Sequence, residues 1–440
     1  MVPKITATVP GRRPDVERWF RGELEGEVVK ENSARTVWRV RGAGLYVKRF
    51  APKLLRDRAR READLLGALA RAGVPCPRPV ATARDARGTY LVTEEIAGAR
   101  DLYSLIAEGA PHVRRHLASV AALLRRLHDA GFEHQDLHAG NVLVRDDEMF
   151  VLDVHRARRG RLSAARRLGG VAFMAMSFSD MVPLTEVHRF FRAYGVRDRG
   201  GLLDLWERLR RLRHLHWGGR EDRCVREGTG FGVRGDVYGR KGAGIDALPA
   251  ATDGGDEAIE RLPGGRFLKR SRAARRIWRN AHALSLRSIP TPRLDACGPG
   301  WVVGEWIDAP NLGDFVRERF PRMGRAERDA FLFALARAVR RMHARGACHR
   351  DLKSSNILVT ERGFSFVDID RVRFSEEVPE ADRIFNLAQL NASVVGTATR
   401  ADRLRFLHRY IGRDRELWLR RRDWVRRVMR ATVARRHFWP

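Results

Sequence analysis

The sequence predicts an α+β protein built from two tandem copies of one domain, each with a small antiparallel β lobe and a mostly helical lobe. The first observation is a repeated polar motif: an Asp, an Asn five residues later, and a second Asp that ends the next apolar stretch. Its two copies are, in order, Asp136, Asn141 and Asp153, then Asp351, Asn356 and Asp368. Corresponding residues are all 215 positions apart. The second observation is that each motif follows the same order of predicted strands and helices.

The first predicted element in each half is a strand that carries a lysine. Residues 45–50 contain Lys48 and residues 266–270 contain Lys269, each among strand-forming residues. Of the 85 basic residues in the chain, 7 are Lys and the rest are Arg. Lysine in both strands therefore indicates a site that needs the compact charge of an ammonium group.

The elements that follow each lysine strand also correspond. An arginine-rich helix comes next, and a Pro-x-Pro segment ends it because proline cannot continue a helix. A β-rich stretch and an amphipathic helix with apolar residues at steps of three and four complete the order. The β-rich stretches are residues 90–96 and 301–307, and the helices are residues 113–127 and 331–342. The motif and a smaller helical remainder follow each helix.

The length of 440 residues suits two domains of about 200 residues each. A glycine-rich, poorly periodic stretch precedes the second lysine strand. We therefore expect a domain at residues 1–220 and another at residues 221–440.

The repeated motif has the arrangement of a kinase catalytic loop, so we expect phosphoryl transfer from ATP. The expected bases, which would accept the proton of a substrate hydroxyl, are Asp136 and Asp351. The expected Mg²⁺ ligands are the other oxygen donors of the motif: Asn141, Asp153, Asn356 and Asp368. A single Asp-x4-Asn is common by chance and often caps a turn. Two matching copies, each after a lysine strand, favour the catalytic interpretation.

Further residues complete the expected sites. Lys48 and Lys269 would bind the α- and β-phosphates, and Glu62 would fix Lys48 through an ion pair. Ile277 stands 215 residues after Glu62, which leaves that ion pair open in the second half. Lys353, two residues after a predicted base, could reach the γ-phosphate and is counted with the catalytic residues.

Two glycine segments are candidates for the loop that covers the phosphates in kinases. Residues 228–233 are one residue short of the kinase pattern and lie far before Lys269, and residues 42–44 offer only Gly-Ala-Gly. A flexible surface turn explains either segment about as well.

With these motifs, both halves resemble the lipopolysaccharide kinases, the Kdo and heptose kinases of inner-core assembly, which are small relatives of the protein kinases. The resemblance rests on residues 134–141 and 349–356, the Pro-x-Pro segments, and residues 153–158 and 368–373 in place of D-F-G. It covers residues 35–215 and 260–435. It implies a protein-kinase-like fold, ATP and Mg²⁺, and a sugar hydroxyl of Kdo or heptose on a lipopolysaccharide-core-like glycolipid.

The net charge of +31 raises the question of partners. The basic residues are spread along the chain without a basic tail, so nucleic-acid binding is not expected as the main function. We expect an anionic glycolipid or sugar acceptor and peripheral contact with the inner face of the inner membrane. The absence of a signal-peptide pattern and of an apolar stretch of about 20 residues predicts a cytoplasmic protein. The sequence leaves the oligomeric state open.

A rival hypothesis from another class is a non-catalytic nucleotide-binding or scaffold protein in which one or both halves are pseudokinases. Magnesium-dependent ATP binding at each half distinguishes the two.

Overall fold

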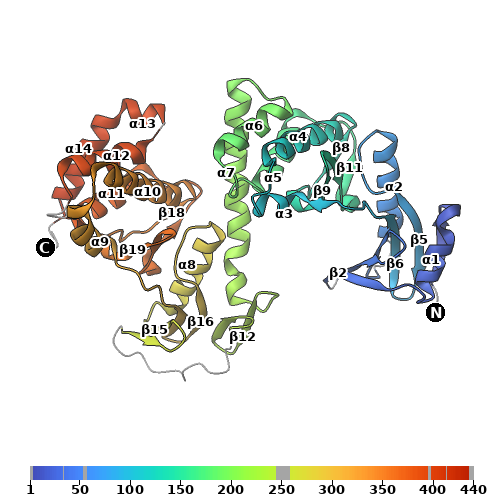
Figure 1. Cartoon of the computed structure of the whole chain (residues 1–440), viewed down its shortest axis with the longest axis horizontal. Coiled ribbons are helices and arrows are strands. Elements are labelled where there is room, and N and C mark those ends of the chain that lie inside the picture. The colour runs from blue at the N-terminus through green and yellow to red at the C-terminus, as the bar shows by residue number, and fades with distance from the viewer. Residues whose placement is uncertain are drawn as a thin grey trace. The chain divides into compact units, whose positions relative to one another are not determined.

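The computed structural model describes residues 3–32, 34–52, 57–243, 258–394, 398–412 and 414–435. It divides into two compact units, Met1–Leu212 and Arg213–Pro440. In each unit most strands gather in one lobe and most helices in another (Figure 1). The expected α+β fold, with a small antiparallel β lobe and a helical lobe in each half, is confirmed.

The elements of the first half are, in chain order, β1 (Lys4–Thr8), η1 (Pro10–Arg12), α1 (Arg13–Phe20), β2 (Gly26–Asn32), β3 (Arg35–Val40), β4 (Leu45–Phe50), α2 (Arg58–Arg71), β5 (Pro79–Asp85), β6 (Gly88–Glu94), β7 (Arg100–Asp101), α3 (Leu102–Ala107), α4 (Val113–Asp129), β8 (Phe132–His134), η2 (Ala139–Asn141), β9 (Val142–Arg145), β10 (Glu148–Val151), η3 (Val154–Arg156), β11 (Ala157–Arg159), α5 (Ala164–Met176), α6 (Leu184–Tyr194) and α7 (Arg199–Glu221). The division between the units falls within α7.

The elements that follow are η4 (Asp222–Val225), β12 (Phe231–Arg234), β13 (Val237–Arg240), β14 (Ile259–Leu262), β15 (Arg266–Arg270), α8 (Ala274–Leu286), β16 (Leu294–Gly298), β17 (Trp301–Glu305), α9 (Leu312–Arg319), η6 (Phe320–Arg322), α10 (Arg325–Ala344), β18 (Ala347–Cys348), η7 (Ser354–Asn356), β19 (Ile357–Thr360), β20 (Gly363–Phe366), η8 (Ile369–Arg371), β21 (Arg373–Phe374), α11 (Glu380–Ser393), α12 (Arg400–Ile411), α13 (Arg415–Leu419) and α14 (Arg421–Val433).

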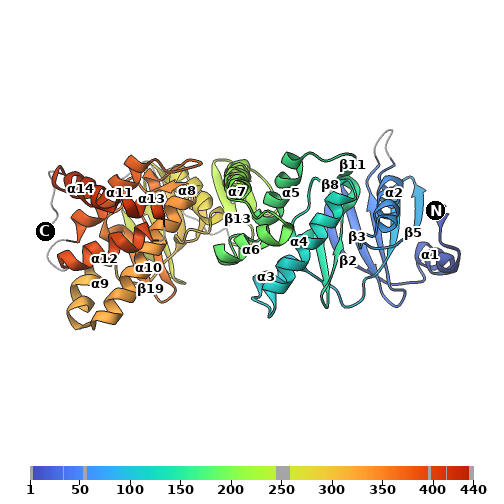
Figure 2. The same cartoon turned by 90° about the horizontal axis from the view of Figure 1, so that it is seen from above.

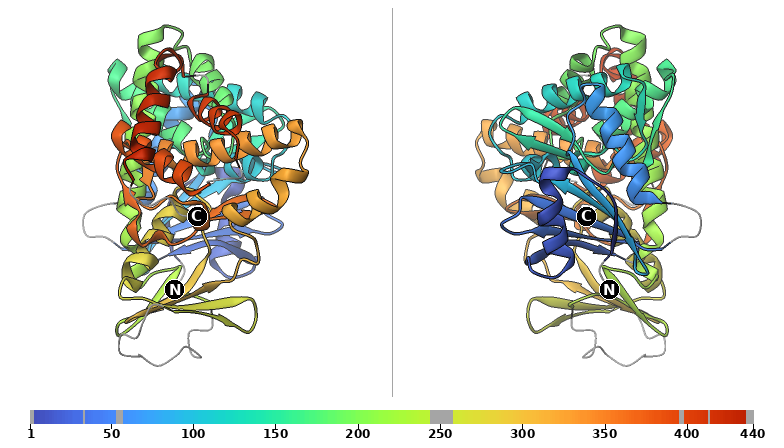
Figure 3. Two further views of the ribbon diagram at one scale, coloured as in Figure 1. Left: turned by 90° about the vertical axis from the view of Figure 1, so that its left-hand side faces the viewer. Right: turned by 90° about the vertical axis from the view of Figure 1, so that its right-hand side faces the viewer.

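The main sheet of each unit has six described strands, and the lysine strand lies inside it. The strand orders are β1-β5-β6-β4-β3-β2 and β12-β13-β16-β17-β15-β14. In the first unit, Leu45 and Val47 of β4 pack with Val16 of α1, on the face opposite to α2 (Figure 3). Phe50 and Leu91 pack with the apolar face of α2 instead. Burial on both faces explains why this lysine strand is strongly apolar.

The helical lobes bury the stripes that the periodicity predicted. Leu117, Val120, Leu124 and Leu127 of α4 are each at most 2% exposed and belong to the core of the first unit. Figure 2 shows α4, α5 and α6 grouped away from α2 and its strands. In the second unit, the corresponding stripe of α10 is also buried. None of the described helices combines the length and apolarity needed to cross a bilayer.

Neither candidate glycine segment lies where a phosphate-covering loop is needed. Residues 42–44 form the turn between β3 and β4, at the end of β3 away from Arg35. Gly42 and Gly44 have φ values of +74° and +59°, so the turn explains both glycines. Residues 228–233 lead into β12, and β13, β16 and β17 separate β12 from the lysine strand β15. The kinase-loop interpretation of both segments is wrong, and they are structural turns.

Candidate active site

The first unit brings together three of the residues that the sequence singled out. Lys48 comes from β4, Glu62 from α2, and Asp153 from the residue before η3. The Lys48 Nζ atom lies 2.7 Å from Glu62 Oε1 and 3.1 Å from Asp153 Oδ1. The ammonium group therefore bridges two carboxylates that are 91 residues apart in the chain.

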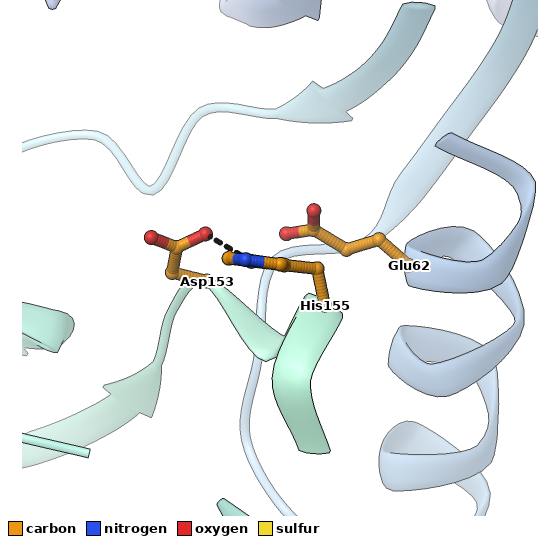
Figure 4. A group of neighbouring side chains, drawn as sticks. All are labelled: Glu62, Asp153 and His155. Carbon is orange, nitrogen blue, oxygen red and sulfur yellow. Dashed lines mark hydrogen bonds and ion pairs between the residues drawn. The ribbon is translucent and has the colours of Figure 1, made fainter. Parts of the chain in front are cut away.

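Asp153 carries more positive partners than the sequence predicted. Arg35 Nη1 lies 2.6 Å from Asp153 Oδ1 and 2.5 Å from Oδ2, and His155 Nδ1 lies 2.9 Å from Oδ1 (Figure 4). Burial alone would raise the pKa of Asp153. The His155 hydrogen bond and the charges of Lys48 and Arg35 outweigh burial and hold this pKa well below its usual range. Asp153 is therefore ionised, and both of its oxygens already accept hydrogen bonds.

His155 and Arg35 were missed for different reasons. His155 follows Asp153 by two residues, so its place within the motif was a usable signal. Arg35 lies 118 residues before Asp153, and among so many arginines nothing in the sequence distinguishes it.

Glu62, Asp153 and His155 also offer metal-ligand atoms within 4.8 Å of one another (Figure 4). Glu62 is 2% exposed, and its Oε2 atom is buried without a hydrogen-bond partner. However, Lys48 contacts both carboxylates of this group. A metal ion bound between them would have to share the position with an ammonium charge, so this group does not fit a resident metal with Lys48 in place.

The catalytic-loop segments have the same hydrogen bonds in both units. Asn141 Nδ2 donates to the Asp136 carbonyl at 2.9 Å, and Asn356 Nδ2 donates to the Asp351 carbonyl at 3.0 Å. The histidine that begins each motif donates through Nε2 to the carbonyl just before the second Asp, at 2.9 Å in both units. These histidines hold the backbone, and the loops keep one geometry.

The two predicted bases differ in their surroundings. Asp136 is 38% exposed at its side chain, and Arg156 lies 4.0 Å away. Asp351 Oδ2 lies 3.3 Å from both Lys353 Nζ and Asn356 Nδ2. Both carboxylates can receive a proton from an incoming hydroxyl, and in the second unit a cation lies beside that position.

The second unit holds its lysine without a helix carboxylate. Lys269 Nζ lies 2.9 Å from Asp368 Oδ1. Ile277 of α8 is 5% exposed, and α8 contains no acidic residue. Burial would raise the pKa of Asp368, but the hydrogen bond and charge of Lys269 lower it below the usual value. Asp368 is 39% exposed at its side chain, so this carboxylate remains open to a further ligand.

A cavity of about 590 Å³ lies beside this pair in the second unit. Lys269, Asn356 and Asp368 line its polar part, whereas Val302 and Leu358 are among its apolar lining. A volume of this size suits a small-molecule ligand. The donor set fits a nucleotide with Mg²⁺: carboxylate and amide oxygens for the metal, an ammonium for phosphate, and an apolar wall for a base.

Buried amides of α11 fasten the catalytic loop of the second unit. Asn386 Oδ1 accepts from the His349 amide at 3.3 Å. Gln389 accepts from the Leu352 amide at 3.0 Å and donates to the Arg350 carbonyl at 2.9 Å. The sequence analysis did not identify these two residues.

The corresponding positions of the first unit, 215 residues earlier, are Val171 and Met174, which are fully buried. The first loop is therefore supported by apolar packing where the second is supported by hydrogen bonds. Such buried amides fix a loop firmly because leaving one of them unpaired is costly.

The chain matches the model of the lipopolysaccharide kinase (Kdo/WaaP) family over residues 16–194 and 308–410. It belongs to this family. The two matched segments of this lipopolysaccharide kinase family member contain both copies of the motif, whereas Lys269 lies outside the second segment.

Two curated relatives illustrate the family. Over 172 residues the chain is 31% identical to the 3-deoxy-D-manno-octulosonic acid kinase of Vibrio parahaemolyticus serotype O3:K6 (strain RIMD 2210633), which covers 36% of this chain and 65% of that protein. Over 125 residues it is 30% identical to the lipopolysaccharide core heptose(I) kinase WaaP of Escherichia coli (strain K12), covering 24% of this chain and 47% of that protein. The chain thus spans less than two thirds of the length of these relatives.

Among solved structures, WbdD with the kinase inhibitor LY294002 is similar at 21% identity and a TM-score of 0.31. The match covers 41% of this chain and 44% of that chain.

Proposed function

We propose that the protein is an ATP- and Mg²⁺-dependent kinase that phosphorylates a sugar hydroxyl, on Kdo or heptose, of a lipopolysaccharide-core-like glycolipid. The observation that carries this proposal is the lysine–aspartate pair that recurs beside an Asp-x4-Asn loop in both units. Membership of the lipopolysaccharide kinase family and the printed activities of two relatives support the acceptor class. In this proposal, residues 1–220 and 221–440 each form one kinase-like domain.

The proposed roles follow from the contacts in the second unit. Asp351 accepts the proton of the sugar hydroxyl as the hydroxyl oxygen bonds to the γ-phosphorus and the bond to ADP breaks. Lys269 binds phosphate oxygens, and Lys353 lies close enough to Asp351 to bind the transferred group. Asn356 and Asp368 would hold Mg²⁺, which supplies neutralisation of phosphate charge. Asp136, Asn141, Asp153, Lys48 and Glu62 are the corresponding residues of the first unit.

The test is phosphoryl transfer from labelled ATP by the purified chain to Kdo-lipid A, to a heptosylated core acceptor and to the free sugars. We expect transfer to a glycolipid. Asp351→Asn should lower the transfer by the second unit, and Asp136→Asn that by the first, by about 10²-fold or more, because the base is lost. Nucleotide binding should persist in both variants, because the proposed metal ligands remain.

Asp308→Asn is the matched control, since this side chain is 81% exposed and lies outside both sites. Transfer that is unchanged in both base variants, or absent with every acceptor, would contradict the proposed reaction.

The alternative, a non-catalytic nucleotide-binding or scaffold half, is favoured in the first unit by one observation. Both oxygens of Asp153 are already occupied by side-chain donors. Nucleotide binding without transfer by this unit would assign it to the pseudokinase class.

A further inference from the structure

Three cationic side chains of the first unit share one face of its sheet. Across the strands, Lys30 of β2 is paired with Val37 of β3, which is paired with Lys48 of β4. Residues directly opposite on antiparallel strands place their side chains on the same face. Arg35 lies two residues before Val37 on β3 and therefore joins this face. Because Arg35 and Lys48 both contact Asp153, this face of the sheet covers the proposed active site.

The connection between β2 and β3 has the wrong composition for a loop that binds phosphate through its backbone. In kinases such a loop is rich in glycine, because only glycine lets backbone amides approach phosphate oxygens closely. Here the residues between Glu31 and Arg35 are Asn32-Ser33-Ala34, without glycine. Lys30 and Arg35 stand on either side of this segment. Long cationic side chains thus occur where backbone amides would otherwise serve.

We propose that Lys30 and Arg35 form a phosphate-binding site of the first unit, for the triphosphate of a nucleotide, in place of a glycine-rich loop. The inference rests on the proposed function, because the triphosphate is that of the phosphoryl donor. It assigns two residues that the kinase motif does not contain.

The Arg35–Asp153 contact then has a specific meaning. With no nucleotide bound, Arg35 is the main counter-ion of Asp153, since its Nη1 lies within 2.6 Å of both carboxylate oxygens. When a metal–nucleotide complex binds, the carboxylate gains another positive partner, and the planar guanidinium can turn to phosphate oxygens, for which its geometry is well suited. Lys30 supports this arrangement: its pKa is lowered first by burial and then by the nearby charge of Arg35, which places the two cations close together.

A competing explanation uses the same contact. If Arg35 only blocked Asp153, it would close the first unit to metal and nucleotide. The two explanations predict opposite effects when the arginine is removed: weaker ATP binding if Arg35 binds phosphate, and tighter ATP binding if it is only a block.

The experiment measures nucleotide binding by calorimetry on the full chain in which Lys269→Ala and Asp368→Ala have silenced the second unit. ATP with Mg²⁺ is titrated in parallel with adenosine, which lacks phosphates. Arg35→Ala should weaken ATP binding about tenfold or more, as expected for loss of a charge-assisted hydrogen bond, and leave adenosine binding unchanged. Lys30→Ala should weaken ATP binding in the same sense. Arg35→Lys, which keeps the charge but loses the fork, should have an intermediate effect.

Arg41→Ala is the matched control, because this arginine also lies near β3 but is 68% exposed at its side chain and pairs with Glu27. Thermal unfolding of each variant checks folding, and Lys30→Ala with Arg35→Lys carries the test if Arg35→Ala does not fold. ATP binding that is unchanged or tighter in the arginine variants would overturn the proposal.

The same titrations distinguish this inference from the proposed function. If the unmodified chain binds no nucleotide, the proposed kinase function fails. If the unmodified chain binds ATP but the chain with a silenced second unit does not, the phosphate site of the first unit is wrong and the kinase proposal stands on the second unit.

Discussion

Asp153 and Asp368, 215 residues apart, adopt the same left-handed backbone, with φ and ψ of +60° and 43° in one and +56° and 51° in the other. Residues other than glycine rarely adopt this conformation, and Asp is one of those that tolerate it best. Each also receives the ammonium group of a strand lysine. The two carboxylates can therefore be tested in the same way.

Replacing either carboxylate should remove one metal-dependent nucleotide site. We expect calorimetry with ATP and Mg²⁺ to find two sites in the unmodified chain and one in Asp153→Ala or Asp368→Ala. Asp146→Ala is a suitable control, because Asp146 is also left-handed, with φ +55°, but lies in the turn between β9 and β10. A single site in the unmodified chain would show that one half does not bind nucleotide.

The buried ion pair of the first unit should matter to that unit alone. Glu62→Gln removes the charge that holds Lys48 from α2, so we expect about tenfold weaker activity or nucleotide binding in the first unit. The second unit should be unaffected because Ile277 occupies the corresponding position. Asp64→Asn, an exposed change on the same helix, should have no effect. Equal losses in both units would contradict this assignment.

Each helical lobe contains a buried histidine bonded to a tyrosine, and these pairs predict acid sensitivity. His128 Nδ1 lies 2.8 Å from the Tyr194 hydroxyl, and His343 Nδ1 lies 2.8 Å from that of Tyr410. Burial lowers the pKa of both histidines to about 4. Between about pH 6.5 and 4 the unfolded chain therefore binds protons that the folded chain does not, and stability falls as the pH falls.

Each histidine can account for up to about 3 kcal/mol of this loss. Urea unfolding at pH 7 and pH 4.5 measures it. His343→Gln should reduce the pH dependence of the second unit, although its stability at pH 7 also falls. A pH dependence identical to that of the unmodified chain would contradict the prediction.

The positive surface should bind anionic membranes peripherally. A net charge of +31 favours an anionic surface by about 1 kcal/mol for each well-placed basic residue, and salt screens this attraction. We expect co-sedimentation with vesicles that contain anionic lipid, release by high salt, and little binding to neutral vesicles. Binding that responds neither to lipid charge nor to salt would argue against electrostatic association.

The sequence predicted the repeated parts of both sites better than the parts that differ. Lys48, Asp153, Lys269 and Asp368 were found because the same residue types recur at one spacing on predictable strands. Arg35 could not be found this way, because its contact with Asp153 depends on which strand lies beside β4. Glycine content also misled, since the glycines near both lysine strands serve ordinary turns.

The supports of the second catalytic loop were equally hidden. Asn386 and Gln389 lie among the apolar residues of α11, and single buried amides leave no periodic pattern. Their partners are backbone groups of the catalytic loop, which only the tertiary structure brings to them.

The absence of a carboxylate on α8 changes how the second unit could be controlled. In the first unit, any movement of α2 also moves Glu62, so whatever binds this helix would be felt at Lys48. In the second unit, Lys269 is tied to Asp368 alone among the described carboxylates, and a shift of α8 would leave that bond in place. The first unit is thus built to respond to signals through its helix, whereas the second is insulated from them.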